Sequence, residues 1–277
     1  MELVRLACQM PDEVGRSLSL WDCGELARHL EREGIVGSIS PQTVQRILAS
    51  HRLKPWRSHV WLRKQAPRDA DFIARTKEIC DLYTRPLAPN EAVFSVDEKT
   101  SIQPRTRLAP TRAARPDQPV QVEHEYKRGG AVNLLAAFNT RTGKVFGKTY
   151  GRKRQIEFID FLEFVDRETP SEVTVIHILC DNVSTHHGKK VRAWLEKHPR
   201  FKFHFTPGHC SWMNQVEQWF GILQRKRLRI PNFADLDDLA RKIEQFIGEW
   251  NLIAKPFGWT PQSFSKILAK AEADVAA

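Results

Sequence analysis

The sequence is short of cysteines at the spacings used by disulfide frameworks and metal motifs. Five cysteines form an odd set among 277 residues, and no two of them make a C-x-x-C pair. A small disulfide-stabilised fold usually needs an even set, and a zinc knuckle needs closely spaced cysteines. The sequence therefore indicates neither, and a reducing cytoplasm is the compartment that fits this cysteine usage best.

Long hydrophobic runs are lacking as well. The first residues, MELVRLACQMPDEVGR, contain too short an apolar run and too many acids for a signal peptide. No later stretch stays apolar for about 20 residues, the length that spans a bilayer. We therefore expect no membrane partner. No internal repeat or low-complexity tract is visible either. With 41% hydrophobic residues, the chain can bury the cores of one large domain and one small one.

The excess positive charge lies in one segment. The net charge is +10, yet residues 1–98 contain 14 Lys and Arg against 14 Asp and Glu, and residues 155–277 contain 16 against 16. Residues 99–154 contain 13 against 3, so they hold the whole excess. A solvated surface usually mixes its signs, whereas one basic block in a neutral chain is typical of a protein that binds a polyanion. Nucleic acid is therefore favoured over plain solubility as the explanation.

Residues 1–52 have the apolar spacing of helices joined by turns. Ser19 with Asp22 resembles a capping box before a first helix. Ser40 and Pro41 predict the start of a second helix, because serine is a good N-cap and proline favours the first helical position. The outer face of this second helix would present Gln42, Thr43, Gln45 and Arg46.

Two short helices with polar side chains on the second are typical of a helix-turn-helix, which offers such groups to base edges in the major groove. A small helical bundle with a polar outer face is an equal alternative, because the connecting turn is longer than usual. Residues 53–70 hold two prolines and two tryptophans and predict a basic linker between domains. Its Lys54 and Arg57 would lie along a DNA backbone.

Residues 71–277 predict one large domain in which strands alternate with helices. A helix that begins just before this domain is expected over residues 69–83. Strands are predicted at 92–96, 131–138, 144–150, 173–180 and 201–205, with further helices at 155–168, 189–197, 214–227 and 235–250. This order predicts an α/β domain with a mixed sheet flanked by helices.

Two of the predicted strands lead directly into an aspartate. Asp97 follows the strand at 92–96, and Asp181 follows the apolar strand at 173–180. Functional groups gather at the carboxyl ends of strands, and an acid at the end of a buried strand is costly unless a cation neutralises it. Glu217 lies on a helix whose apolar stripe would pack on the sheet. Each acid alone has an ordinary surface explanation, and their joint placement favours a site.

Three carboxylates can hold two Mg²⁺ ions about 4 Å apart. Such a centre activates a water or a 3′-hydroxyl and stabilises the leaving oxygen, so it can cut phosphodiester bonds without a Ser or Cys nucleophile. Glu98 is a rival for Asp97, but strand alternation sends neighbouring side chains to opposite faces. A zinc site from His204, His209 and Cys210 matches no common ligand spacing.

Basic side chains around these acids would hold DNA phosphates. The candidates are Arg105, Arg107, Arg112, Lys127, Arg128, Arg152, Lys153, Arg154, Arg225 and Lys226. For Arg225 and Lys226, a favourable basic helix C-terminus is the alternative. His186 and His187 closely follow Asp181 and either orient a phosphate or a water, or simply occupy a helix N-terminus.

Five segments of the sequence resemble the mariner-like transposases of bacterial insertion sequences. FSVDEKTSIQ, LCDNVSTHH and PGHCSWMNQVEQWFG resemble the family's three catalytic motifs in order, and 35 residues separate Asp181 from Glu217, close to the family's spacing. SPQTVQRIL with LKPW resembles the family's second helix-turn-helix and linker, and AKPFGWTP resembles its C-terminal signature. The match covers roughly residues 18–265, and chance agreement in five places is improbable.

The resemblance implies a ribonuclease-H-like fold in which Asp97, Asp181 and Glu217 are metal ligands for two Mg²⁺ or Mn²⁺ ions. It implies a DNA transposase that binds double-stranded DNA at terminal inverted repeats, excises the element and inserts it at a TA dinucleotide. A homodimer or larger assembly on DNA, in the cytoplasm with the nucleoid, would follow. The helix-turn-helix then becomes the expected form of residues 1–52.

Family members usually carry two helix-turn-helix units, so we expect the first to be absent or reduced to residues 1–11. Two alternatives to a transposase stay open. One is a DNA-binding regulator or an inactive truncated transposase that binds without cutting. The other is a structure-selective nuclease that hydrolyses DNA but never joins strands.

Overall fold

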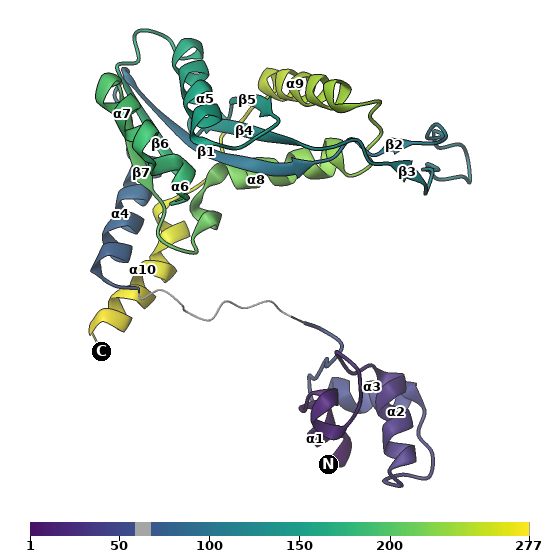
Figure 1. Cartoon of the computed structure of the whole chain (residues 1–277). Coiled ribbons are helices and arrows are strands. Elements are labelled where there is room, and N and C mark those ends of the chain that lie inside the picture. Colours follow the sequence, from purple (N-terminus) through teal and green to yellow (C-terminus); the bar gives the residue numbers. More distant parts are fainter. Residues whose placement is uncertain (59–67, 277) are drawn as a thin grey trace. The chain divides into compact units, whose positions relative to one another are not determined.

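The computed structural model describes residues 1–58 and 68–276 of the chain (Figure 1). Contacts divide it into two compact units, Met1–Gln65 and Ala66–Ala277. Residues 59–67, which include half of the predicted linker, lie outside the described residues. In the described ranges, no helix is both long and apolar enough to cross a membrane.

The smaller unit is a helical bundle around its own hydrophobic core. Its elements are α1 (Glu2–Ala7), a 3₁₀ turn (Pro11–Val14), α2 (Cys23–Arg32) and α3 (Pro41–Ser50). Trp21, Leu26, Leu30, Val44 and Leu48 are almost wholly buried between them.

The helix starts of the smaller unit follow their capping residues. Ser40 caps α3 as predicted, because its hydroxyl accepts a hydrogen bond from the backbone N–H of Thr43 at 3.1 Å. The prediction of a capping box at Ser19 was wrong by three residues. Asp22 is itself the N-cap of α2 and accepts from the N–H of Glu25 at 2.8 Å. Aspartate and serine cap helices about equally well, so the pattern alone did not choose between them.

The larger unit is built on a five-stranded mixed sheet. The strands are β1 (Glu91–Ile102), β4 (Val132–Asn139), β5 (Val145–Tyr150), β6 (Val175–Cys180) and β7 (Phe201–Phe205), in the order β5-β4-β1-β6-β7. β1 pairs antiparallel with β4 and parallel with β6, and β7 is parallel to β6. The sheet is therefore mixed and open, as the sequence predicted.

Helices cover both faces of this sheet (Figure 1). On one face α5 (Gln155–Glu168) and α7 (Lys189–Lys197) close a core, with the short α6 (Ser184–His187) beside α5. On the other face α8 (Gln215–Leu223) and α9 (Leu236–Leu252) form a second core. α4 (Ala70–Thr84) and α10 (Pro261–Ala276) pack together on that same face, over β1 and β6. The sequence did not predict α10.

β1 is longer than predicted, because it does not end at Asp97. Its parallel pairing with β6 ends at Ser95, but its antiparallel pairing with β4 continues past Asp97 to Lys99. A bulge then shifts the register before Ile102. The polar residues after Val96 hid this extension, since strand prediction relied on apolar alternation.

A long excursion, residues 103–131, leaves the sheet after β1 and returns at β4; we call it the arm. Its base is the ribbon of β2 (Thr106–Arg107) and β3 (Tyr126–Lys127), with isolated bridges further out at Arg112 with Gln121 and Arg115 with Gln118. Figure 1 shows the arm projecting beyond the sheet. It holds 6 of the 13 Lys and Arg of residues 99–154 and all three of the acids there.

Candidate active site

Asp97 and Asp181 lie side by side at one end of the two central parallel strands. The pairing of β1 with β6 brings Ser95 opposite Leu179, and two residues further along each strand are Asp97 and Asp181. Side chains two apart on a strand share a face. Both acids therefore start from the face on which α8 packs. Asp97 is buried, with 6% of its surface exposed, and Asp181 is partly buried.

Glu217 approaches the same place from α8. Val216, Trp219 and Phe220 bury one side of this helix against the sheet, and Glu217 lies in its exposed first turn. The N–H groups of a first turn have no helical partners, which favours a negative charge there. The sequence prediction that these three acids meet agrees with this geometry.

A buried hydrogen-bond network ties the start of α8 to β1. The Asn214 side chain is fully buried, and its Nδ2 donates to the carbonyl of Val96 at 2.9 Å and to Oδ2 of Asp97 at 3.1 Å. Ser95 donates its hydroxyl proton to Oδ1 of Asn214 and accepts from the N–H of Val216 at 2.9 Å. Asn214 therefore orients one Asp97 oxygen while fixing the helix that carries Glu217.

The acids destabilise one another's charge. Burial raises the pKa of Asp97 to about 7, the N–H of Glu98 opposes the rise, and the carboxylates of Asp181, Glu217 and Glu98 add to it. Burial also raises the pKa of Glu217, against which the charge of Lys99 acts. These shifts follow from desolvation and like-charge repulsion. A cation between the acids would relieve both causes.

His186 connects Asp181 to Glu98 on the opposite face of the sheet. Its Nδ1 lies 2.9 Å from Oδ1 of Asp181, its Nε2 lies 3.2 Å from Oε2 of Glu98, and the ring is 1% exposed. Burial opposes its protonation, but Asp181, Cys180 and Glu98 together raise the pKa of His186. Burial acts to raise the pKa of Asp181 too, yet His186 outweighs it and the net shift is downward.

The rivalry between Asp97 and Glu98 is settled by position. Glu98 faces His186 and Lys153, whose Nζ lies 3.7 Å from Oε1 of Glu98. The hydrogen bond with His186 lowers the pKa of Glu98. Its carboxylate is thus neutralised by protein groups, whereas that of Asp97 is not. This difference supports Asp97 as the ligand.

The donor set suits a hard divalent cation. Carboxylate oxygens of Asp97, Asp181 and Glu217 are the ligands that Mg²⁺ and Mn²⁺ prefer. Both contacts that hold the Asp181 carboxylate, from His186 and from the N–H of Val183, use Oδ1. In residues 1–58 and 68–276, no three His, Cys, Asp or Glu side chains already converge on one metal position.

His204, one of the possible zinc ligands, contacts other side chains. Nε2 of His204 lies 2.8 Å from Nδ1 of His177, and its Nδ1 lies 2.6 Å from Oε1 of Glu78. His209 and Cys210 belong to the loop before α8 and join no metal cluster in the described chain. His187 is exposed and packs edge-on against Phe205, and its role in orienting a phosphate or a water stays a prediction.

The DNA-binding candidates of the smaller unit are on its surface. Gln42, Gln45 and Arg46 are exposed on α3, and Thr43 is partly buried at its start. Lys54 and Arg57, which follow α3, are exposed as well. No contact in the described chain tests whether these side chains bind DNA.

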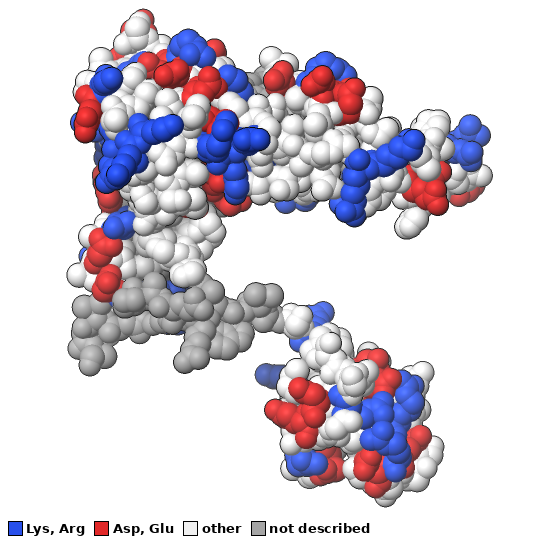
Figure 2. Space-filling model, in the orientation of Figure 1, with Lys and Arg blue, Asp and Glu red and all other residues white. Residues whose placement is uncertain are grey.

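The basic candidates of the larger unit differ in what they contact. Arg107 donates to the carbonyls of Glu123 and Pro231, which holds the base of the arm together. Arg154 pairs with Glu157 and closes the first turn of α5. The remaining candidates are exposed: Arg105, Arg112, Lys127, Arg128, Arg152, Lys153, Arg225 and Lys226. Figure 2 shows Lys and Arg side chains along the arm and over the part of the unit from which it extends.

Ser95 and Asn214 were not predicted as site residues, and Lys99 was predicted only as one cation of the basic block 99–154. Asn214 carried one available signal, because asparagine is a preferred N-cap and stands directly before the helix of Glu217. Here it serves another purpose, since its side chain bonds β1 instead of its own helix. Ser95 and Lys99 carried no signal that distinguishes them from ordinary strand residues.

Comparison with known proteins adds a family and a fold. Residues 92–240 match the family model described as DDE superfamily endonuclease. The chain resembles the Mos1 transposase paired-end complex with left transposon end (TM-score 0.54, 18% identity) and the pre-cleavage Mos1 transpososome (0.53, 18%), over 99% of this chain and 77% of those. The Mos1 strand transfer complex gives 0.53 and 16%, over 99% and 76%. Comparison with curated proteins finds no match.

These likenesses confirm the ribonuclease-H-like fold class, a mixed sheet flanked by helices and preceded by a helical region. The family match covers more than half of the chain and includes Asp97, Asp181 and Glu217. The chain therefore belongs to the DDE superfamily of endonucleases.

Proposed function

We propose that this endonuclease is a DNA transposase, which cuts phosphodiester bonds at the ends of a mobile element and joins the freed 3′-hydroxyl to target DNA. The observation that carries the proposal is the meeting of Asp97, Asp181 and Glu217 at one edge of a sheet. The fold is shared with Mos1 transposase, whose solved complexes hold paired ends and a strand-transfer product.

The three acids use divalent cations, and we propose two Mg²⁺ or Mn²⁺ ions. A Mos1 mariner paired-end complex has been solved with Mn. When bound, such ions lower the pKa of an attacking water or 3′-hydroxyl and stabilise the leaving oxygen. Oxygen donors and the raised pKa values of Asp97 and Glu217 support this set of ligands.

The chain's own residues hold the acids in position for this chemistry. Asn214 and the N–H of Glu98 fix the two oxygens of Asp97, so its carboxylate has one orientation. His186 fixes Oδ1 of Asp181 and leaves Oδ2 available to a ligand. Lys99 carries positive charge to the edge of the acid cluster, where a DNA phosphate would arrive.

DNA would be held at two places. In the smaller unit, the exposed side chains of α3 would read base edges of terminal inverted repeats, as the recognition helix of a helix-turn-helix. In the larger unit, the basic arm would hold phosphates without regard to sequence. Assembly of two or more copies on paired ends, insertion at TA and action in the cytoplasm at the nucleoid are further parts of the proposal.

Cleavage of a supercoiled plasmid tests the proposal. The plasmid carries the sequences that flank the gene, and nicked, excised and joined products are measured with Mg²⁺. We expect products with the wild type and none with Asp181→Asn or Asp97→Asn. Asp237→Asn is the matched control, because Asp237 is an exposed acid on α9 outside the site, and it should cut like the wild type.

Two outcomes would replace the proposal. If the wild type does not cut but still shifts the flanking DNA in a gel, the chain is a DNA-binding regulator. If the wild type cuts but never joins the released 3′-hydroxyl to another DNA, it is a nuclease of the same fold.

A further inference from the structure

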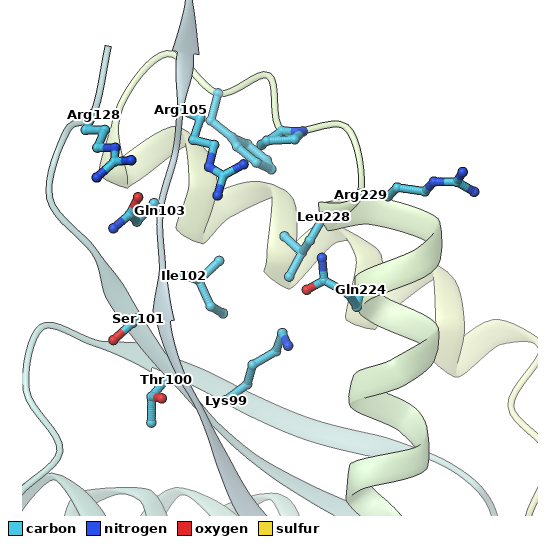
Figure 3. A pocket seen from close by; sticks show the side chains of 12 residues that line it. Lys99, Thr100, Ser101, Ile102, Gln103, Arg105, Arg128, Gln224, Leu228 and Arg229 are labelled. Atoms are coloured by element: carbon cyan, nitrogen blue, oxygen red, sulfur yellow. The ribbon is translucent and has the colours of Figure 1, made fainter. Parts of the chain in front are cut away.

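A pocket lies beside the acid cluster, between the end of β1, the base of the arm and the turn after α8; we call it the basic pocket. Its volume is about 430 Å³. Figure 3 shows Lys99 of β1 and Gln224 of the turn after α8 pointing toward one another across it, with Arg105 and Arg128 of the arm above them. None of these residues is needed to hold the three acids.

The basic pocket concentrates positive charge without neutralising it. Lys99, Arg105, Arg128 and Arg229 line it, and none of its lining residues is acidic. In the described part of the chain, none of these four cations forms an ion pair with a carboxylate. Arg105 stacks its guanidinium on the ring of Tyr126 at 5.2 Å, which fixes its direction. Four cations this close repel one another, so the arrangement favours an anion between them.

The backbone around the basic pocket is strained. Ser101 has φ 56° and Arg105 has φ 46°, in the left-handed region that non-glycine residues avoid. Ser101 sits in the β1 bulge, where its N–H is bonded to Oδ1 of Asn133 at 3.2 Å. Such residues persist only where the surrounding structure holds them, and they cluster at functional sites. The strain is a second sign, independent of charge, that this wall is built for a ligand.

The basic pocket adjoins the acids directly. Lys99 follows Asp97 by two residues, on the same side of β1 and about 7 Å along the strand. Ile102 and Leu228, both 7% exposed, provide an apolar floor. A chain with an anionic group at each end and a less polar unit between them fits this layout.

We propose that the basic pocket binds one nucleotide of the DNA strand next to the scissile phosphate, with cations on the two phosphates that flank its sugar. This inference rests on the proposed function and names where the cut strand runs. Lys99 holds the phosphate nearest the acids, and Arg105 and Arg128 of the arm hold the next one. The sugar lies over Ile102 and Leu228, so the pocket selects the backbone and not the base.

Neutralising single phosphates tests the proposal. In the flanking DNA used above, one phosphate at a time, within about four nucleotides of the mapped cut, is replaced by an uncharged methylphosphonate. One or two substitutions on one side of the cut should slow wild-type cleavage about tenfold or more, the loss expected for a charged hydrogen bond. The double variant Lys99→Gln/Arg128→Gln should cleave unmodified DNA slowly. The methylphosphonates that slow the wild type should then slow this variant by less than about a further twofold.

Arg167→Gln is the matched control, since Arg167 is an exposed cation at the far end of α5. It should keep the full methylphosphonate penalty. A double variant that keeps the full penalty as well would overturn the basic pocket while leaving the transposase proposal intact. If no protein cuts, the proposed function has failed, and binding of the same methylphosphonate series still tests the pocket. Should the double variant not fold, the single variant Lys99→Gln replaces it.

Discussion

At the level of single residues, the site places negative charge where burial disfavours it. Asp97 has 6% of its surface exposed and lies beside two further acids of the site, so its carboxyl has a pKa near 7 in place of about 4. Proteins keep such residues when function needs them, and stability decreases as a result. The protein should therefore gain stability when the acid is removed.

The first prediction is that Asp97→Asn raises the melting temperature of the metal-free chain at pH 8. The native state keeps the Asp97 proton up to a pH of about 7 and the unfolded state loses it near 4, so stability falls as the pH rises between these values. The pKa shift of Asp97 corresponds to at most about 4 kcal/mol of lost stability. Asparagine lacks one of the two hydrogen-bond acceptors, so the net gain in the free energy of unfolding should be about 1–3 kcal/mol. Thermal unfolding followed by circular dichroism measures it.

Millimolar Mg²⁺ gives the internal control for this prediction. Added Mg²⁺ should raise the melting temperature of the wild type and leave Asp97→Asn unchanged, because a ligand that binds only the native state stabilises it. A variant that melts below the wild type at pH 8 would show that Asp97 is not a charged, destabilising group.

His177 predicts a pH dependence outside the active site. Burial, then the neighbouring His204, lowers its pKa below the usual 6.5, while Glu91 acts against this. Arg85 and Glu78 are the other charges of this cluster. The native state then binds fewer protons than the unfolded state just below pH 6.5, so stability should fall as the pH drops from 7 toward 5. His177→Gln should lose less stability over this interval, and an equal loss in both proteins would contradict the prediction.

Sequence reasoning reached the acids but not the residues that hold them. Asp97 was preferred over Glu98 because it directly ends the apolar run 93–96, which is a local property, and the structure places Glu98 on the opposite face, at His186. Asn214 and Asp97 are 117 residues apart, and their contact exists only once α8 packs on β1. No local pattern contains that information.

At the level of elements, α8 is positioned by the strand that carries Asp97. Ser95 bonds the N–H of Val216, and Asn214 bonds the carbonyl of Val96, so the first turn of α8 is fixed to the middle of β1. Tyr83 of α4 adds a bond from its hydroxyl to the carbonyl of Met213 at 2.8 Å. The position of Glu217 relative to Asp97 is therefore set by hydrogen bonds between side chains and backbone groups.

Removing this connection should damage both stability and metal use. Asn214→Ala leaves the Val96 carbonyl without this partner and the Ser95 hydroxyl proton without an acceptor in the core, at a cost of about 2–4 kcal/mol. It also frees an Asp97 oxygen, so the Mg²⁺ concentration for half-maximal cleavage should rise severalfold.

Ser95→Ala separates the two effects, because it keeps the contact between Asn214 and Asp97. It should destabilise the chain without moving the Mg²⁺ dependence. If both variants need more Mg²⁺ to the same degree, Asn214 has only a structural role.

Elements were predicted well where short-range signals act. The strand at 201–205 and the helix at 155–168 match their predicted bounds. Asp69, the first residue of the helix predicted over 69–83, is the N-cap of α4, which ends at Thr84. The end of α8 differs from the predicted helix over 214–227, because a π-helical turn over Gln224–Leu228 replaces the regular α-helix. This turn lies beside the basic pocket, and a change of helical winding leaves no trace in apolar spacing.

At the level of the whole molecule, the two units have separate hydrophobic cores: among the described residues, one cluster lies in Met1–Gln65 and three lie in Ala66–Ala277. Leu26 and Leu48 belong to the core of Met1–Gln65, whereas Phe264 of α10 packs against α4 in Ala66–Ala277. Units with separate cores unfold independently unless a large interface couples them.

Paired core substitutions test this independence. Leu26→Ala should lower the free energy of unfolding of the smaller unit by about 2–5 kcal/mol and shift only that unit's thermal transition. Phe264→Ala should lower that of the larger unit by about 3–5 kcal/mol and shift only the other transition. Differential scanning calorimetry resolves the two. A single transition that both variants shift equally would show that the units unfold as one.

The alternation along β1 also governs how gene copies of this protein can decay. Deleting one residue between Glu91 and Val96 would turn the following part of the strand over, so Glu98 would replace Asp97 on the face of α8. The apolar side chains of Phe94 and Val96 would leave their core at the same time. Such a copy would still encode three acids in order while being unable to fold. For this family, an intact alternation of the strand before the first acid therefore indicates a gene for an active protein better than the three acids do.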